Sequence, residues 1–99
     1  MPRTRADILV MLESEVPRLR SEFGVKSLAL FGSFARDQGR PESGIDLLVE
    51  FDRPVGLFHL VKTQQHLERL CDREVDLVTP VGLAPRIKRR VLTEAIDAG

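Results

Sequence analysis

The stretch Leu28-Ala-Leu-Phe-Gly-Ser-Phe-Ala-Arg36 joins an apolar run to a glycine–serine turn. The run from Leu28 to Phe31 is typical of a buried strand, and it stops at Gly32-Ser33, where a tight turn is expected. Ser33 is predicted to cap a short helix over residues 33–37. Because backbone N–H groups gather at such a turn, it is a candidate anion site.

A second strand is predicted from Ile45 to Phe51. Successive side chains of a strand point to opposite faces. One face would carry Ile45, Leu47, Val49 and Phe51, and the other Asp46, Leu48 and Glu50. The sequence therefore places a candidate anion site and a carboxylate face at the two ends of one connecting loop.

The composition limits the class of protein. The chain has 99 residues, of which 42% are hydrophobic and 30% charged, as expected for one globular domain with a modest core. Fifteen basic and fifteen acidic residues cancel, whereas general nucleic-acid or anionic-membrane binders carry a basic excess. The single cysteine, Cys71, cannot form an internal disulfide, and neither a signal peptide nor a membrane span is expected. We expect one domain, residues 1–99, in the cytoplasm.

Helices and strands are predicted to alternate along the chain. Residues 4–23 read as helical, with Thr4 as N-cap and Gly24 as the stop. Pro17 either kinks one helix or lies near the start of a second short helix, and we favour the second. The middle of the chain is predicted to form a strand from Lys26 to Phe31, a loop at residues 39–41, a turn at 52–56 and a helix from Leu57 to Cys71. A strand from Glu74 to Thr79 and a last helix over 85–98 follow. The buried face of that helix is predicted to carry Ala84, Ile87, Val91 and Ala95. This order indicates an α/β or α+β domain with a small sheet.

Asp46 and Asp76 lie in predicted strands whose opposite faces are apolar. If those strands are neighbours, two carboxylates project from one open sheet face. Carboxylates in that arrangement are usual ligands of Mg²⁺, which takes one or two of them together with substrate phosphates. Alternatively, each aspartate is a solvated residue on the exposed side of its strand. A glycine–serine turn taken alone is equally common in proteins without such a site.

Three segments in combination resemble the minimal nucleotidyltransferases, a family of the DNA polymerase beta-like nucleotidyltransferase superfamily. They are Leu30-Phe-Gly-Ser-Phe-Ala-Arg36, Ser43-Gly-Ile-Asp-Leu-Leu-Val49 and Val75-Asp-Leu-Val78, and the likeness extends to the Leu83-Ala-Pro-Arg-Ile-Lys88 segment. The resemblance implies a small mixed sheet flanked by helices, the nucleotidyltransferase fold. It also implies that the chain binds Mg²⁺ and a nucleoside triphosphate such as ATP.

The resemblance further implies roles for five residues. Gly32 and Ser33 match the turn that contacts the triphosphate, and Arg36 matches the basic residue beside it. Asp46 matches the second acid of an Asp-x-Asp pair, and Asp76 matches the third acid of the metal site. Two metal ions would orient an attacking hydroxyl and neutralise charge on the phosphates.

One position departs from the family pattern in a way that affects the expected activity. The first acid of the Asp-x-Asp pair is Gly44 here, and glycine supplies neither a ligand nor a charge. Its loss is expected to weaken metal binding and misplace the triphosphate. Glu42 and Glu50 are the nearby acids considered as substitutes, although neither replaces the position directly. Asp37 also stands where the family usually has glycine.

Other chemically active side chains have simpler interpretations. His59 and His66 lie seven residues apart on one predicted helix, without an acid or cysteine at metal-ligand spacing, and read as surface or partly buried residues. Cys71 reads as a core residue. The basic residues at the start of the last helix read as a solvated face or as a patch for RNA, a nucleotide or an acidic partner; they are Arg86, Lys88, Arg89 and Arg90.

The resemblance implies a toxin–antitoxin role, because minimal nucleotidyltransferases are often antitoxins paired with a HEPN-domain ribonuclease. The first hypothesis is an enzyme that uses Mg²⁺ to transfer AMP from ATP to a hydroxyl of that partner. The second, motivated by Gly44, is a degenerate nucleotidyltransferase that neutralises its partner by contact alone. The third is a domain that binds nucleotide without turnover. Self-association remains open on the sequence.

Overall fold

The structure, a computed structural model, describes residues 4–36, 38 and 44–98. Its elements, in chain order, are α1 (Arg5–Phe23), β1 (Val25–Phe31), α2 (Gly32–Ala35), β2 (Ile45–Phe51), α3 (Leu57–Cys71), β3 (Val75–Val78), the 3₁₀ helix η1 (Pro80–Gly82), α4 (Pro85–Glu94) and β4 (Ile96–Asp97). This is the α+β arrangement that the alternation of strands and helices predicted. The predicted loop at residues 39–41 lies outside the described residues.

The four strands form one mixed sheet in the order β3-β2-β1-β4. The β1 strand is antiparallel to β2 and to β4, whereas β2 and β3 are parallel. A parallel pair needs a long crossover connection, and α3 supplies it. The parallel register pairs Asp46 with Asp76 and brings the start of β3 beside the start of β2.

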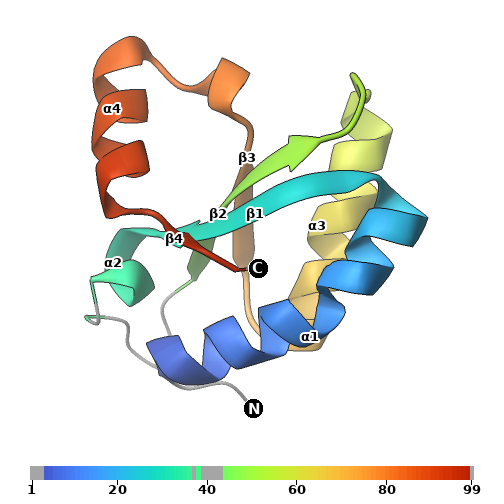
Figure 1. The fold of residues 1–99 in the computed structure, drawn as a ribbon, viewed down its shortest axis with the longest axis horizontal. Helices are drawn as coiled ribbons and strands as arrows, with labels where there is room; N and C mark the ends of the chain where they lie inside the picture. The colour runs from blue at the N-terminus through green and yellow to red at the C-terminus, as the bar shows by residue number, and fades with distance from the viewer. Residues whose placement is uncertain (1–3, 37, 39–43, 99) are drawn as a thin grey trace.

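Helices cover both faces of this sheet (Figure 1). The α1 and α3 helices pack on one face over the main core, which contains Leu12, Leu19, Leu30, Leu47, Val49 and Leu67 among its buried residues. The α4 helix lies on the other face, where Val91 packs against Ala29 and Leu48. Both sides of β2 are therefore buried along its middle, which confirms the predicted alternation of Ile45, Leu47 and Val49 toward the larger core.

The first helix confirms its predicted ends but not its predicted interruption. Thr4 and Asp7 form a capping box, and Gly24 ends the helix in the left-handed conformation with φ 68°. We expected Pro17 to begin a second helix, and this was wrong, since Pro17 lies inside one continuous helix. Leu12 and Leu19, on either side of the proline, are both fully buried against the sheet. That shared packing outweighs the missing backbone donor.

The last predicted helix is shorter than expected and is followed by a strand. Ala95 has φ −66° and ψ 141°, so the helix stops at Glu94, and Ile96 and Asp97 pair with β1. These two residues cover what would otherwise be an open strand edge. The predicted inner stripe was also wrong in part, because Val91 is buried whereas Ile87 is 54% exposed. Within the described part of the chain, no helix is long and apolar enough to cross a membrane.

Candidate functional site

The two aspartates singled out from the sequence occupy matching positions on neighbouring strands. Asp46 is the second residue of β2, Asp76 is the second residue of β3, and the parallel register pairs them directly. Asp46 is half-buried and Asp76 is exposed. The condition on which a carboxylate pair depended, that the two strands are neighbours, is met. The expectation of an open face was only partly right, since α4 covers the middle of that face and leaves the aspartates at its edge.

The Asp46 carboxylate is destabilised by its surroundings. Burial raises its pKa above the ordinary value of 3.8, and the negative charge of Asp76 raises it further, while the positive charge of Arg36 acts in the opposite direction. Two carboxylates held side by side at one end of a sheet favour a cation between them. These oxygen donors are of the kind that Mg²⁺ takes in pairs alongside phosphate oxygens.

The glycine–serine turn lies against this carboxylate pair. Gly32 has φ +75°, and a Cβ added to it would overlap Oδ2 of Asp46. Glycine is therefore required here both by its backbone conformation and by the closeness of the carboxylate. The predicted capping role of Ser33 was wrong, because the N-cap of α2 is Phe31 and Ser33 is the second residue of the helix. The strand ends at Phe31 as predicted, but the helix begins directly after it, at Gly32, and this places Ser33 inside the helix.

Ser33 and both aspartates line one cleft of about 610 Å³. Among the described residues, the lining consists of Ser33, Gly44, Asp46, Gln64, Glu68, Glu74, Val75 and Asp76. Cavities of a few hundred Å³ with a small number of convergent polar groups are typical of small-molecule sites. The cleft combines the start of β2, the start of β3, the turn after β1 and one side of α3, so its residues come from four separate parts of the sequence.

Gly44 lies in the wall of this cleft with room for a side chain. A Cβ added to Gly44 would lie 3.5 Å from the carbonyl oxygen of Glu74, an ordinary van der Waals distance. That carbonyl accepts the backbone N–H of Ile45 at 2.9 Å and fixes the local backbone. A Cβ therefore fits at position 44 at ordinary contact distances. In residues 4–36, 38 and 44–98, no three His, Cys, Asp or Glu side chains are grouped to hold a metal ion. The register pairs Asp46 with Asp76, which gives two carboxylates on neighbouring strands.

Of the two acids considered as substitutes for the missing one, Glu50 does not line the cleft. Glu50 lies four residues along β2 from Asp46, about 13 Å at 3.3 Å per residue. Glu42 and Asp37 lie outside the described residues. Sequence reasoning missed Glu74, whose Cβ lies 3.9 Å from a Cβ placed on Gly44. Only the parallel register of β2 and β3 reveals this proximity, because the two residues are thirty positions apart.

A second glutamate in the cleft wall has a structural partner. Glu68 of α3 accepts the backbone N–H of Val75 at 3.1 Å through Oε2. This hydrogen bond ties the helix to the first residue of β3, next to Asp76. Glu68 therefore fixes the strand that carries a site carboxylate.

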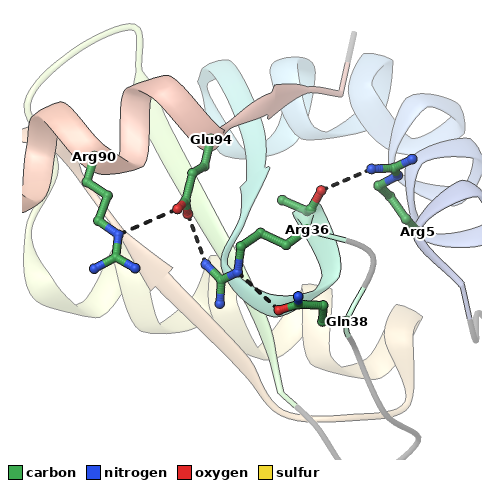
Figure 2. Close-up of polar contacts among 6 residues, drawn as sticks. Arg5, Arg36, Gln38, Arg90 and Glu94 are labelled. Carbon is green, nitrogen blue, oxygen red and sulfur yellow. Dashed lines mark hydrogen bonds and ion pairs between the residues drawn. The ribbon is translucent and has the colours of Figure 1, made fainter.

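Arg36 is near the carboxylates but does not line the cleft. Its Nη1 donates to Oε2 of Glu94 at 3.0 Å, and its Nε donates to the side chain of Gln38 at 3.5 Å. Arg90 of α4 also pairs with Glu94, at 3.5 Å. Figure 2 shows Glu94 between the two arginines, at the end of α4. The Arg36 charge nevertheless reaches the carboxylate of Asp46 and opposes the rise of its pKa.

The remaining candidates have structural roles. His59 Nε2 lies 2.6 Å from the carbonyl oxygen of Phe23, and the His66 ring packs 4.8 Å from the Phe23 ring. His59 is partly buried, in agreement with the sequence interpretation, whereas His66 is buried and was interpreted as more exposed than it is. Cys71 is buried, and burial raises the pKa of its thiol to about 11, which agrees with a core role. The predicted basic residues of α4 are all exposed.

The fold and the cleft together define a nucleotidyltransferase-type domain, as the sequence resemblance predicted. The sequence profile of the nucleotidyltransferase domain family matches residues 12–98. The chain therefore belongs to that family.

Two relatives are named for an adenylyltransferase activity. The candidate protein adenylyltransferase MJ0435 of Methanocaldococcus jannaschii is 42% identical over 74 residues, which cover 75% of this chain and 80% of the relative. The protein adenylyltransferase MntA of Thermococcus cleftensis is 32% identical over 93 residues, which cover 94% of each chain.

Solved structures share the same fold. A candidate minimal nucleotidyltransferase superposes with a TM-score of 0.80 at 35% identity over 94% of both chains, which confirms the resemblance. A toxin–antitoxin complex with AMP-PNP gives 0.74 at 21% identity over 88% of this chain and 72% of the other. The structure of a tri-AMPylated Shewanella oneidensis HEPN toxin in complex with MNT antitoxin gives a TM-score of 0.67 at 19% identity, over 92% of this chain and 71% of the other. At these lower identities, the likeness is one of fold alone.

Proposed function

We propose that this chain is a minimal nucleotidyltransferase-type antitoxin that transfers AMP from ATP to a hydroxyl group of a HEPN-type toxin. The observation that carries the proposal is the convergence of Ser33, Asp46 and Asp76 on one cleft, with the Gly32 turn against the carboxylates. The names of the relatives support the reaction type, and the titles of the solved complexes support the class of partner.

The chain's own residues must bind the phosphates, offset the charge on the leaving group and accept a proton. The acceptor oxygen forms a bond to the α-phosphorus of ATP, the bond from that phosphorus to the bridging oxygen breaks, and pyrophosphate leaves. Ser33 and the backbone of the turn bind phosphate oxygens, and Arg36 offsets charge on the departing pyrophosphate. The hydroxyl proton passes to a cleft carboxylate or to water.

Asp46 and Asp76 would hold Mg²⁺ through their carboxylate oxygens. When bound, the ion supplies electrostatic stabilisation of the charge on the phosphates. The donor set fits this ion, since Mg²⁺ is usually bound through one or two carboxylates plus phosphates. Burial and then the negative charge of Asp76 raise the pKa of Asp46, and a cation bound between the two carboxylates would act against this rise.

Gly44 favours a second candidate function for the same fold. Without the first acid of the pair, the chain would neutralise its partner by contact or bind nucleotide without transferring it. In that case, Asp46→Ala and Asp76→Ala would leave neutralisation intact while the protein stays folded. A loss of neutralisation in those two variants would exclude the contact-only function.

The deciding experiment compares the wild-type chain with Gly44→Asp. Each is incubated with labelled ATP, Mg²⁺ and the toxin encoded next to it, and AMP addition is read by mass spectrometry. The variant is informative because the wall of the cleft accommodates a side chain at this position. Glu50→Gln serves as a control for a changed charge on the same strand.

Transfer by both proteins supports the proposed enzyme as it stands. Transfer by Gly44→Asp alone supports a binding role for the native chain on an intact substrate site. If neither protein transfers AMP, the proposed activity is wrong and the family relationship concerns the fold.

A further inference from the structure

The side chain of Arg36 is fixed by partners outside the cleft. Glu94 accepts from Nη1 at 3.0 Å and Gln38 accepts from Nε at 3.5 Å. The side chain of Glu94 is only 24% exposed, whereas that of Arg36 is 41% exposed. A partly buried acceptor thus holds one side of a guanidinium whose remainder is open to solvent.

These contacts leave most of the hydrogen-bonding capacity of Arg36 unused. A guanidinium has five N–H donors in a planar fork. Among the described residues, one N–H on Nε and one on Nη1 are engaged, which leaves three for another ligand. The unused donors suit phosphate oxygens, which match the geometry of the fork. Glu94 therefore orients the guanidinium without saturating it.

Glu94 is itself held in place from α4. Arg90 lies one turn earlier on the helix and pairs with the other carboxylate oxygen, Oε1, at 3.5 Å. On the opposite side, Nη1 of Arg5 donates to the carbonyl oxygen of Ala35 at 3.1 Å and ties α1 to α2 next to Arg36. Figure 2 shows this arrangement, in which α1 and α4 fix the short helix that carries Arg36 from two directions.

We infer that Glu94 is a positioning residue that presents the Arg36 guanidinium to the triphosphate. The inference rests on the proposed function and adds to it a residue in α4, fifty-eight positions from Arg36. Fixing a long side chain before binding removes an entropic cost that the ligand would otherwise have to meet. If Glu94 instead competed with phosphate for Arg36, removing its carboxylate would strengthen nucleotide binding.

The test measures the affinity for AMP-PNP with Mg²⁺ by calorimetry in the full chain. Arg36→Ala is expected to weaken binding about tenfold or more, and Glu94→Ala about threefold to tenfold. Glu94→Gln keeps an acceptor oxygen for Nη1 and is expected to retain most of the affinity. In the double variant, the loss is expected to equal that of Arg36→Ala alone, since Glu94 acts through Arg36.

A matched control and a second readout separate positioning from general stability. Glu22→Ala breaks another arginine–glutamate pair, Arg18–Glu22 at 2.8 Å on α1, and is expected to leave the affinity unchanged. NMR relaxation of the Arg36 Nε–H group is expected to show an ordered side chain in wild type and a mobile one in Glu94→Ala.

The possible results distinguish this inference from the proposed function. Unchanged or tighter binding by Glu94→Ala, while Arg36→Ala weakens binding, overturns the positioning role alone. Additive losses in the double variant overturn it as well, because Glu94 would then act independently of Arg36. Absence of AMP-PNP binding by wild type overturns both this inference and nucleotide binding as part of the proposed function.

Discussion

The backbone of Gly32 lies so close to the carboxylate of Asp46 that the two residues constrain each other. A Cβ on Gly32 would overlap Oδ2 and lie 3.0 Å from Cγ of Asp46. Phe31, the residue before the turn, is also the strand partner of Asp46 in β1–β2 pairing. The turn therefore continues the β1–β2 ladder and follows directly from the register of the sheet.

Gly32→Ala is expected to destabilise the fold and to displace Asp46. Alanine at a positive φ costs about 1–2 kcal/mol, and the overlap with the carboxylate adds to this. We expect the free energy of unfolding to fall by about 2–3 kcal/mol in urea titrations, and Mg²⁺ affinity to fall with it.

Gly56→Ala is the matched control for that substitution. Gly56 is the N-cap of α3 with φ −83°, and a Cβ there has no neighbour within 4 Å. The free energy of unfolding of Gly56→Ala is expected to differ from that of the wild type by less than about 1 kcal/mol. Equal losses in both glycine variants would contradict the argument from closeness to Asp46.

Asp46→Asn is expected to stabilise the protein at neutral pH and to remove one carboxylate from the candidate Mg²⁺ site. Burial and the Asp76 charge raise the pKa of Asp46 above 3.8, so the folded state binds its proton more tightly than the unfolded chain does. As pH rises from 3.8 through the raised pKa, the unfolded chain loses this proton first and the wild type loses stability. Above that window the penalty remains constant.

Thermal unfolding at several pH values checks whether ionisation of Asp46 lowers the stability of the wild type. The Asp46→Asn variant is expected to have the higher Tm at pH 7, and the difference is expected to shrink as pH falls toward 3.8. Mg²⁺ is expected to raise the Tm of the wild type and not that of the variant. A lower Tm of the variant at pH 7 without Mg²⁺ would show that the carboxylate contributes favourable contacts instead.

Cys71 provides a separate test at alkaline pH. Burial raises the pKa of its thiol from 9.0 to about 11, so the unfolded chain releases this proton at lower pH than the folded protein does. Stability is therefore lost as pH rises from about 9 to about 11. Cys71→Ala, although less stable at pH 7 because of the lost packing, is expected to show a shallower decline in this interval in urea titrations. Equal declines in the stability of the wild type and of Cys71→Ala would show that the Cys71 thiol does not cause the loss.

The local parts of this fold could be predicted from the sequence because their signals are local. The bounds predicted for Ile45–Phe51 and Leu57–Cys71 agree with those of β2 and α3. In both cases, the apolar periodicity is clear and turn residues flank the segment. The alternation of Asp46 and Asp76 with apolar residues placed each aspartate on the opposite face from its apolar neighbours, but the pairing of their strands was only a condition, because alternation within a strand does not fix its neighbour.

The parts that failed depend on tertiary partners. Pro17 remains in a helix because Leu12 and Leu19 pack on the same core. The two-residue strand β4 exists only because the edge of β1 accepts it. Glu74 stands beside Gly44 through strand register, and Glu94 meets Arg36 across fifty-eight residues. No pattern within one segment of sequence contains these relationships.

Pro17→Ala is expected to stabilise the protein. Pro17 is exposed in the interior of α1, where it provides no N–H for the helix. Proline in a helix interior is about 3 kcal/mol less favourable than alanine, and alanine restores the missing donor. The unfolded chain regains freedom without the proline, which offsets up to about 1 kcal/mol. We therefore expect a gain of about 1–2 kcal/mol in the free energy of unfolding by urea titration, with Glu13→Ala near neutral as the control. A loss of stability in Pro17→Ala would mean that the sheet requires the distortion that proline imposes on the helix.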